Sequence, residues 1–393
     1  MKKYTAGFVF PVSSAPIQNG VVITDDSGKI LAVEHRDQHD PASLDIRRGI
    51  LAPGFVNTHC HLELSHMKGR VNTGTGLIPF ITGVVTQRNA TAEIIADAIE
   101  KAEAEMLEGG IVALGDISNA PDTFEVKSRG RMRYYTFVEL FDFLQEAGAD
   151  KAFADWSAVY GQLQPAAGSN GSLSPHAPYS VSKKLFRQIQ TFNPDRGITV
   201  SIHNQETPPE NELFERGSGD FYDFYGKFNI SLDHFVPSGK GSIHYALDNM
   251  NPANRTIFVH NTLSTADDIR AAQAWSPHTF WATCPNANLY IENRLPNYQA
   301  FIDTGARVTI GTDSLTSNWQ LSILEEMKTI ARYQSYVPFD MLLRWATLNG
   351  AQALGFDDTL GSLDVGKTPG VLLLEGIGPD GSNLDRATVK RLI

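Results

Sequence analysis

The stretch Leu51-Ala-Pro-Gly-Phe-Val-Asn-Thr-His59-Cys-His61 decides the expected fold of this chain. It is a short apolar run, typical of a buried strand, and it ends in two histidines separated by one residue. Side chains alternate between the faces of a strand, so His59 and His61 are expected to point the same way. Two adjacent imidazoles at a strand end supply half of a site for a divalent metal ion. The alternative is one packed core histidine and one surface histidine.

Segments typical of strands and helices alternate after this stretch. A helix is expected at Ala92–Glu108, where apolar residues recur on one face from Ile94 to Met106. The expected strands are Ile50–Asn57, Ile111–Ile117, Met132–Glu139, Gly171–Pro175, Gly197–His203, Thr256–His260, Thr279–Thr283 and Arg307–Gly311. This succession predicts an α/β fold, a (β/α)8 TIM-type barrel. A doubly wound sheet is the alternative, but it needs a glycine-rich turn where this chain has His-Cys-His.

Both ends of the chain have a different rhythm. Residues 1–50 contain short alternating segments separated by turn residues, which is typical of a β-meander, and short strands return after Leu360. We therefore expect a small β-sandwich domain built from residues 1–50 together with 355–393, beside a barrel of residues 51–354. A disordered C-terminal tail is the alternative, but the apolar run Leu372–Leu374 argues against it.

Composition narrows the classes of function. The 393 residues carry a formal net charge of −11, with 42% hydrophobic and 20% charged residues, as in ordinary globular proteins. No basic run offsets this charge, so we expect neither nucleic acid nor a membrane as a partner. With two cysteines, Cys60 and Cys284, and no recognisable signal peptide, we expect no disulfide framework and a cytoplasmic location. The expected partner is a small-molecule substrate, and a homodimer remains open.

Four metal-binding side chains fall at expected strand ends. His59 and His61 follow the first strand, His203 ends the fifth and Asp313 follows the eighth. The carboxyl ends of barrel strands converge on one face, so these groups should meet. Three imidazoles and a carboxylate suit one Zn²⁺, with Fe²⁺ as the alternative. A single ion is favoured because strand four ends in Ser-Pro-His, without the lysine that bridges two ions in barrels of this type. Taken alone, Asp313 could be a turn residue.

Two further residues have the chemistry of proton transfer. Glu206 lies three residues after His203, where the strand ends, and is expected to reach the same cavity as general base and then acid. Its alternative is a solvated loop residue, which is how we interpret Glu210, Glu212 and Glu215. The segment Glu206–Glu215 is expected to be either a lid or a partner-binding loop. His260 ends the sixth strand and is expected to orient the attacking water, with a core histidine as the alternative.

Other residues are expected to contact the substrate. His176 follows strand four in a loop stiffened by Pro175 and Pro178. The remaining candidates, each of which has a turn or packing interpretation as its alternative, are Asn286, Asn288, Arg294, Phe80 and Trp319. The two asparagines could recognise a polar edge, and Phe80 could stack on a planar ring.

These motifs together resemble the amidohydrolase superfamily. The similarity rests on Pro-Gly-Phe-Val-Asn-Thr-His59-Cys-His61, Ser-Pro-His176-Ala-Pro-Tyr-Ser, His203-Asn-Gln-Glu206, Val-His260-Asn, Cys-Pro-Asn-Ala-Asn and Gly-Thr-Asp313-Ser, and it runs over nearly the whole chain. The chain resembles most the branch of chlorohydrolases, guanine and cytosine deaminases and adenosine-analogue deaminases. Its His61-Leu-Glu63-Leu-Ser run is similar to that of aminodeoxyfutalosine deaminases. It departs from the family pattern at Gly366–Gly370, in the expected small domain.

The resemblance implies a function and a set of roles. His59, His61, His203 and Asp313 would bind one Zn²⁺ or Fe²⁺, Glu206 would shuttle protons, and His260 with Asp313 would position a metal-bound hydroxide. The expected enzyme is a metal-dependent hydrolytic deaminase, acting on the C–N bond of an aminated purine, a nucleoside analogue or a related N-heterocycle. The alternative is an amide, cyclic-amide or chloro-ring hydrolase of the same fold. A non-catalytic binding protein is disfavoured because no ligand position is lost.

Overall fold

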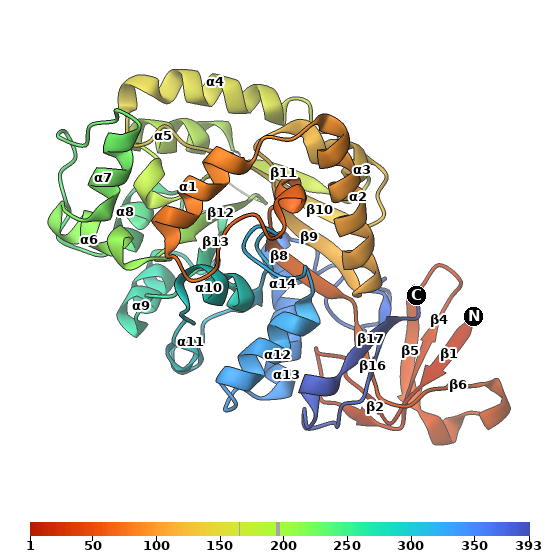
Figure 1. Cartoon of the computed structure of the whole chain (residues 1–393). Helices are drawn as coiled ribbons and strands as arrows, with labels where there is room; N and C mark the ends of the chain where they lie inside the picture. Colours follow the sequence, from red (N-terminus) through yellow and green to blue (C-terminus); the bar gives the residue numbers. More distant parts are fainter. Residues whose placement is uncertain (165, 194–196) are drawn as a thin grey trace.

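The computed structural model describes residues 1–164, 166–193 and 197–393. Two sheets near the chain termini lie to one side of a larger α/β body (Figure 1). The first sheet has the order β5-β4-β1-β6, with bounds Ile30–His35, Gly20–Thr24, Lys2–Thr5 and Asp45–Ile46. The second has the order β17-β16-β7-β2-β3, with bounds Thr388–Arg391, Val371–Glu375, Ile50–Pro53, Phe8–Val9 and Ile17–Gln18. Strands from both ends of the chain therefore share one sheet.

The expected strand Ile50–Asn57 is in fact two strands. Its first half, β7, pairs with β16 and β2 in the sheet of the chain ends, so that sheet extends past the expected boundary at residue 50 to Pro53. The second half, β8 (Phe55–Cys60), belongs to the larger body. The chain passes between them at Gly54, where an added Cβ would lie 2.6 Å from the Pro369 carbonyl oxygen. The residue without a side chain is what lets the two sheets approach here.

Eight strands of the larger body form two parallel sheets of four. One has the order β11-β10-β9-β8 and the other β12-β13-β14-β15. The bounds of β9 to β15 are Ile111–Ile117, Arg133–Leu140, Asn170–Pro175, Thr199–Asn204, Arg255–His260, Thr279–Thr283 and Val308–Ile310. Each lies within three residues of a strand expected from the sequence. Contacts at both outer edges join the sheets: the His203 N–H donates to the His176 carbonyl (2.9 Å) at one edge, and Cys60 forms an isolated parallel β-bridge with Asp313 at the other.

Helices surround these strands (Figure 1). From α1 to α14 their bounds are Leu77–Gln87, Ala92–Glu108, Phe124–Ser128, Ala149–Tyr160, Lys183–Phe192, Pro208–Arg216, Asp220–Lys227, Ser242–Asn249, Ala266–Trp275, Pro285–Glu292, Tyr298–Asp303, Ile323–Tyr333, Phe339–Ala346 and Leu348–Leu354. Helix α2 has the expected bounds, but Ile94 is exposed, because the buried face carries Ile99, Ala102 and Met106. None of the described helices is long and apolar enough to cross a membrane.

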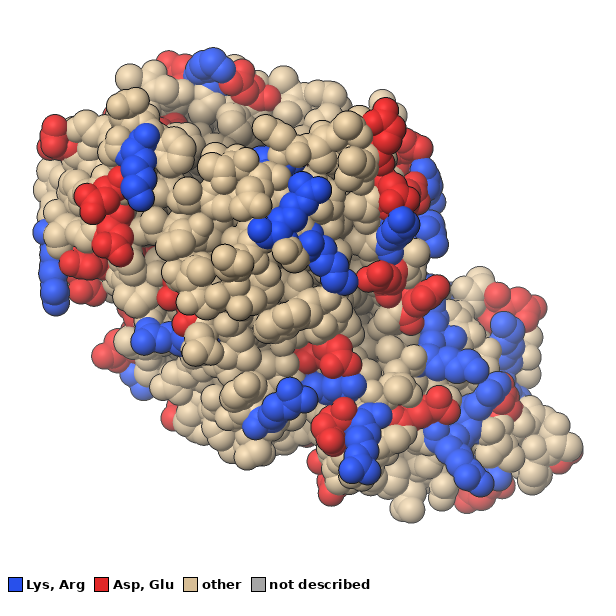
Figure 2. Space-filling view, in the orientation of Figure 1, with Lys and Arg blue, Asp and Glu red and all other residues tan. Residues whose placement is uncertain are grey.

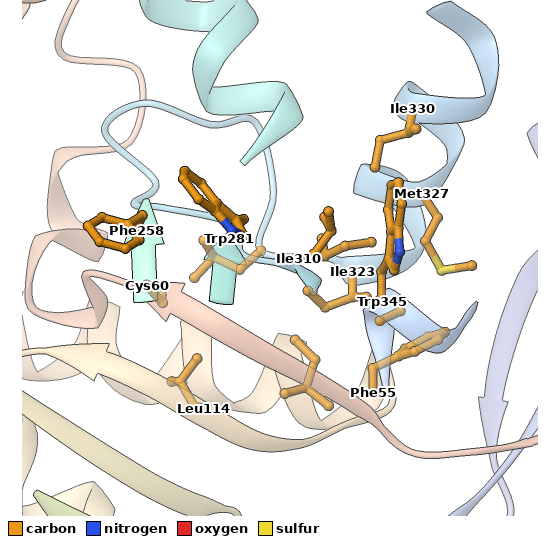
Figure 3. Close-up of a cluster of buried hydrophobic side chains, with 14 of the residues drawn as sticks. Phe55, Cys60, Leu114, Phe258, Trp281, Ile310, Ile323, Met327, Ile330 and Trp345 are labelled. Atoms are coloured by element: carbon orange, nitrogen blue, oxygen red, sulfur yellow. The ribbon is translucent and has the colours of Figure 1, made fainter. Parts of the chain in front are cut away.

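The apolar core lies between the strands and the outer helices. Figure 3 shows Phe55, Ile310 and Trp281 of the strands packed with Met327 of α12 and Trp345 of α13. Burying a side chain of this size contributes about 1.5–3 kcal/mol. This packing fixes the strands, and the residues at their carboxyl ends are held in place with them. On the face shown in Figure 2, acidic and basic side chains are interspersed.

Candidate metal centre and substrate cavity

Three histidines converge at the carboxyl ends of the strands. The ligand nitrogens of His59, His61 and His203 all lie within 4.8 Å of one another. His59 is in β8, but His61 follows the strand instead of alternating within it, at the start of a 3₁₀ turn (Leu62–Met67). Asp313 joins the group, with Oδ1 3.4 Å from His61 Nε2 and 3.7 Å from His59 Nε2. The structure thus brings together all four residues predicted to bind the metal.

Backbone contacts hold Asp313 in this position. Its N–H donates to the His59 carbonyl (3.0 Å), and Ser317 Oγ donates to its Oδ2 (2.6 Å). Gly311 permits the approach, because an added Cβ would lie 2.9 Å from both His59 Cβ and Cys284 Sγ. Asp313 and His260 have φ angles of 54° and 73°, in the left-handed region that non-glycine residues rarely occupy. Such strain costs about 1–3 kcal/mol and is common at functional sites.

The ring of His203 is oriented by the backbone of the neighbouring strand. Its Nδ1–H donates to the His176 carbonyl oxygen at 2.8 Å. This bond fixes the tautomer, so the lone pair of Nε2 is available to a metal. The carboxyl group of Glu139 lies on the same side of the ring, with Oε1 3.3 Å from Nδ1.

The protonation state of the cluster favours metal binding. Burial lowers the pKa of His61 to about 4, and burial likewise lowers the pKa of His59 and His203. Burial alone would raise the pKa of Asp313, but His59, His61 and other histidines hold it below its ordinary value. The site therefore presents neutral imidazoles and a carboxylate, the form in which these groups bind metals.

The four residues fit a divalent metal ion. His59 is fully buried, and neither of its ring nitrogens has a hydrogen-bond partner among the described residues. Buried polar groups are rarely left in that state unless they bind something else. Three nitrogen donors and one carboxylate oxygen are a donor set typical of zinc, and also of iron.

Glu206 and His260 lie together beside this cluster. Glu206 Oε1 is 3.6 Å from His260 Nε2, and both side chains are buried. Burial, with the charge of Asp313 next in importance, raises the pKa of Glu206 well above its ordinary value. His260 Nδ1 donates to Asn288 Oδ1 at 2.9 Å, so its Nε2 carries a lone pair. A buried carboxyl group whose pKa is raised therefore faces the Nε2 lone pair of a buried imidazole whose pKa burial lowers.

The segment after Glu206 corrects an expectation. It is not an open loop, because Pro208–Arg216 is helix α6, and Glu210 in its first turn is fully buried instead of solvated. The Glu210 carboxylate accepts from the backbone N–H groups of Gln205 (2.9 Å) and Glu206 (3.0 Å) and from Ser242 Oγ (2.6 Å). Glu210 thus holds the backbone that carries Glu206.

A cavity of about 340 Å³ opens onto the cluster. Its polar floor includes His61, His203, Glu206, His260 and Asp313, and His176 also lines it. Its walls are largely apolar and come from α1, from α7 and the residues that follow it, and from the segment after β10, namely Leu77, Phe80, Ile81, Val84, Phe141, Phe143, Phe224, Phe228 and Ile230. Phe80, expected to stack on a planar ring, is therefore a wall residue. This combination of a few polar groups and apolar walls is typical of sites for small molecules.

Two residues expected to contact the substrate face elsewhere. The Asn286 side chain donates to Glu326 (3.0 Å) and accepts from Thr329 (2.6 Å), because it lies on the face of α10 that packs against α12. Arg294 is exposed, since α10 ends at the left-handed residue Asn293 and the chain turns outward. Neither residue lines the cavity in the described part of the chain.

Two other expected contacts are indirect or absent. Asn288 is not among the lining residues found in the described ranges, but it contacts His260 and fixes its tautomer. Trp319 is 50% exposed and packs on Tyr290, with ring centroids 5.3 Å apart, instead of forming a cavity wall.

Sequence reasoning missed three carboxylates of the site, which are Glu63, Glu139 and Glu210. Glu63 and Glu139 line the cavity, and both are buried. Glu139 ends the expected strand Met132–Glu139 just as His203 and His260 end theirs, so its position was a usable signal. Glu63 belongs to the His61-Leu-Glu63-Leu-Ser run, which by itself gives this residue no role. Nothing in the local pattern distinguishes Glu210 from the solvated Glu215.

Residues 50–387 match the Amidohydrolase family, and this chain belongs to that family. An adenosine deaminase of Helicobacter pylori is 26% identical over 314 residues, which cover 79% of this chain and 75% of that protein. An aminodeoxyfutalosine deaminase of Deinococcus radiodurans is 29% identical over 366 residues, or 88% of this chain and 83% of that protein. The predicted family is confirmed, and these relatives are deaminases, in agreement with the predicted class of reaction.

The similarity extends to solved structures. A crystal structure of Helicobacter pylori aminofutalosine deaminase in complex with methylthio-coformycin superposes with a TM-score of 0.83. The superposition covers 100% of each chain at 22% sequence identity. At this level of identity, the comparison shows that the two proteins share a fold.

Proposed function

We propose that this protein is a metal-dependent hydrolytic deaminase that removes the amino group of an adenine-type nucleoside. The observation that carries the proposal is the meeting of four metal-binding groups with a buried carboxyl group, Glu206, at the floor of one apolar-walled cavity. The relatives reported above, named for the deamination of adenosine and aminodeoxyfutalosine, support this class of substrate.

The architecture proposed with this function is a closed (β/α)8 barrel. The contacts of His203 with His176 and of Cys60 with Asp313, one at each junction of the two parallel sheets, support closure. We also propose that both chain ends form one small β-sandwich domain beside the barrel. Its support is the pairing of β16 with β7 and of β7 with β2.

The metal would be held by His59, His61, His203 and Asp313, with zinc favoured by the donor set. A divalent ion in such a site lowers the pKa of water enough to make it a nucleophile near neutral pH. Asp313 contributes a negative charge that partly balances the ion, and Ser317 keeps its second oxygen occupied so that Oδ1 faces the histidines.

Glu206 is the proton-transfer group. Burial raises its pKa, which suits a carboxyl group that first accepts a proton from the attacking water and then donates it to the ring nitrogen next to the carbon that bears the amino group. The second proton of the water passes to the amino group, which leaves as ammonia as the carbonyl bond forms. His260 Nε2, which carries a lone pair because Nδ1–H is bound to Asn288, can accept a hydrogen bond from that water.

The walls of the cavity suit a flat ring with an apolar extension. Phe80, Phe141 and Phe228 provide aromatic faces and edges for contact with a heterocycle or an apolar substituent. Closure of such walls around a substrate excludes bulk water, which strengthens every electrostatic interaction at the floor.

The test is an ammonia-release assay with protein loaded with Zn²⁺ and, separately, with Fe²⁺. The panel contains adenosine, 5′-methylthioadenosine, S-adenosylhomocysteine and aminodeoxyfutalosine, with guanine, cytosine, a cyclic amide and a chlorotriazine as comparison compounds. We expect ammonia from at least one adenine nucleoside and none from the matched Glu206→Gln protein at the same enzyme concentration. Ring opening or chloride release, without ammonia from any adenine nucleoside, would refute the proposal in favour of the alternative hydrolase.

A further inference from the structure

Glu139 is a buried carboxyl group whose oxygens have no hydrogen-bond partner in the described part of the chain. It lies in β10 one residue before the strand ends, is fully buried, and lines the cavity. His203 Nδ1 lies 3.3 Å from Oε1 of Glu139, but its N–H is directed to the His176 carbonyl. Because an unsatisfied buried carboxyl group is costly, a partner from the cavity is expected.

The surroundings of Glu139 form a rigid polar wall. Asn119, which follows β9 and also lines the cavity, accepts the backbone N–H of Glu139 on Oδ1 (3.3 Å). The Glu63 carboxylate accepts the backbone N–H groups of Asn119 (2.8 Å) and Ala120 (3.1 Å). Arg88 lies beyond, 3.9 Å from the other oxygen of Glu63. Hydrogen bonds thus join the segments that carry Glu63, Asn119 and Glu139, and the carboxyl oxygens of Glu139 remain available to a ligand.

This wall lies across His203 from the proton-transfer group. Glu139 is adjacent to the Nδ1 side of the His203 ring, whereas the same ring stacks on His260, which contacts Glu206. A substrate whose reacting carbon lies next to Glu206 and the metal ligands would therefore reach Glu139 with a different part of the molecule. For a nucleoside, that part is the group attached to the ring.

A second cation is the competing occupant, and the hydrogen bonding argues against it. Atoms of Glu139, His176 and His203 approach within 4.8 Å of one another, as in a metal site. A cation there would need the lone pair of His203 Nδ1. That nitrogen carries the hydrogen that it donates to the His176 carbonyl at 2.8 Å, so it has no lone pair for a second cation. The lone pair of the ring is on Nε2, which faces the first metal site.

We propose that Glu139, with Asn119 beside it, binds a hydroxyl of the sugar of a ribonucleoside substrate, and this inference rests on the proposed function. A hydroxyl group can donate to the carboxyl oxygens and can accept from the carboxamide of Asn119 at the same time. An ammonium group could only donate, so it would not match this mixed wall as well. Glu139 is thus a specificity residue that selects a ribosyl substrate over a free base or a deoxy analogue.

The experiment compares adenosine with 2′-deoxyadenosine and 3′-deoxyadenosine in metal-loaded wild-type, Glu139→Gln and Glu139→Leu proteins. The control is Glu105→Gln, an exposed glutamate of α2. We expect wild type and control to prefer adenosine over at least one deoxy analogue by roughly 10- to 100-fold in kcat/KM, the range for a hydrogen bond whose loss leaves a buried polar group unpaired. Glu139→Leu should abolish that preference and Glu139→Gln should reduce it, mainly through KM, with one metal per chain in every protein.

Each other outcome has a definite meaning. An equal fall in kcat/KM for adenosine and both deoxy analogues in the Glu139 variants would overturn the sugar subsite while leaving the deaminase intact. Loss of a second equivalent of metal in Glu139→Gln would assign the group to a cation instead. If metal-loaded wild type releases no ammonia from any adenine nucleoside of either panel, the proposed function itself fails, and the subsite with it.

Discussion

Replacement of Glu210 by alanine should damage both stability and catalysis, for separable reasons. The side chain is fully buried and accepts three hydrogen bonds, two of them from the backbone N–H groups of Gln205 and Glu206. Ser242 can rotate to another acceptor, but the two backbone donors cannot move without displacing Glu206. Each donor left unsatisfied in the interior costs about 1–3 kcal/mol, so Glu210→Ala should lower the free energy of unfolding by about 2–6 kcal/mol.

The same change should lower kcat more than it raises KM. Glu206 would lose the hydrogen bond to its backbone N–H, and a displacement of about 1 Å at a reacting group can cost on the order of 10²-fold in rate. Urea unfolding followed by fluorescence measures the first effect, and steady-state ammonia release measures the second. The matched control is Glu215→Ala, an exposed glutamate of the same helix, whose effect should stay within about 0.5 kcal/mol. A Glu210→Ala protein with wild-type unfolding and wild-type kcat would refute the role derived for Glu210.

Three further predictions concern buried carboxylates. Glu206→Gln should retain the metal but lower kcat by about 10²–10⁴-fold, the scale of lost acid–base catalysis, as measured by ammonia release and elemental analysis; near-native turnover would contradict its role. Asp116→Ala should cost about 3–5 kcal/mol in urea unfolding, because it leaves the buried Lys127 ammonium, now 2.6 Å from Asp116, without its partner, and adding Lys127→Met should restore part of the loss. Burial raises the pKa of Glu63 from 4.5 to about 7, so the folded protein keeps a proton that the unfolded chain loses. The stability of wild type relative to Glu63→Gln should therefore fall as pH rises from 4.5 to 7, and a pH-independent difference in unfolding free energy would argue against this shift.

The strands of the larger body were predictable because their residues follow simple periodicities. The apolar run Ile111–Ile117, for example, is the observed strand β9. The proximity of His203, His260 and Asp313 was predictable because parallel strands end at one edge of a sheet. The helix α2 was recognisable for the same reason. The rotation of α2 about its own axis was less predictable. Ile94 fits the apolar periodicity of the helix but is exposed, because the neighbours of the helix decide which face is buried.

What the sequence could not reveal depends on contacts between distant segments. The split of Ile50–Asn57 at Gly54 follows from the return of β16 to pair with β7, which no local pattern announces. Asn286 resembles a recognition residue, but Glu326, forty positions later, takes its amide group. Burial of Glu210 likewise depends on Ser242 and on the turn of the backbone at Gln205.

The central claim is that four side chains, from positions 59 to 313, bind one catalytic metal ion. Elemental analysis of purified, zinc-loaded protein tests it most directly, with His59→Ala, His61→Ala, His203→Ala, Asp313→Asn and Glu206→Gln proteins measured beside the wild type. One equivalent of metal per chain in wild type and Glu206→Gln, with clear loss in the other four variants, is the predicted result. Wild-type protein without metal after loading, or ligand variants that keep a full equivalent, would contradict the account.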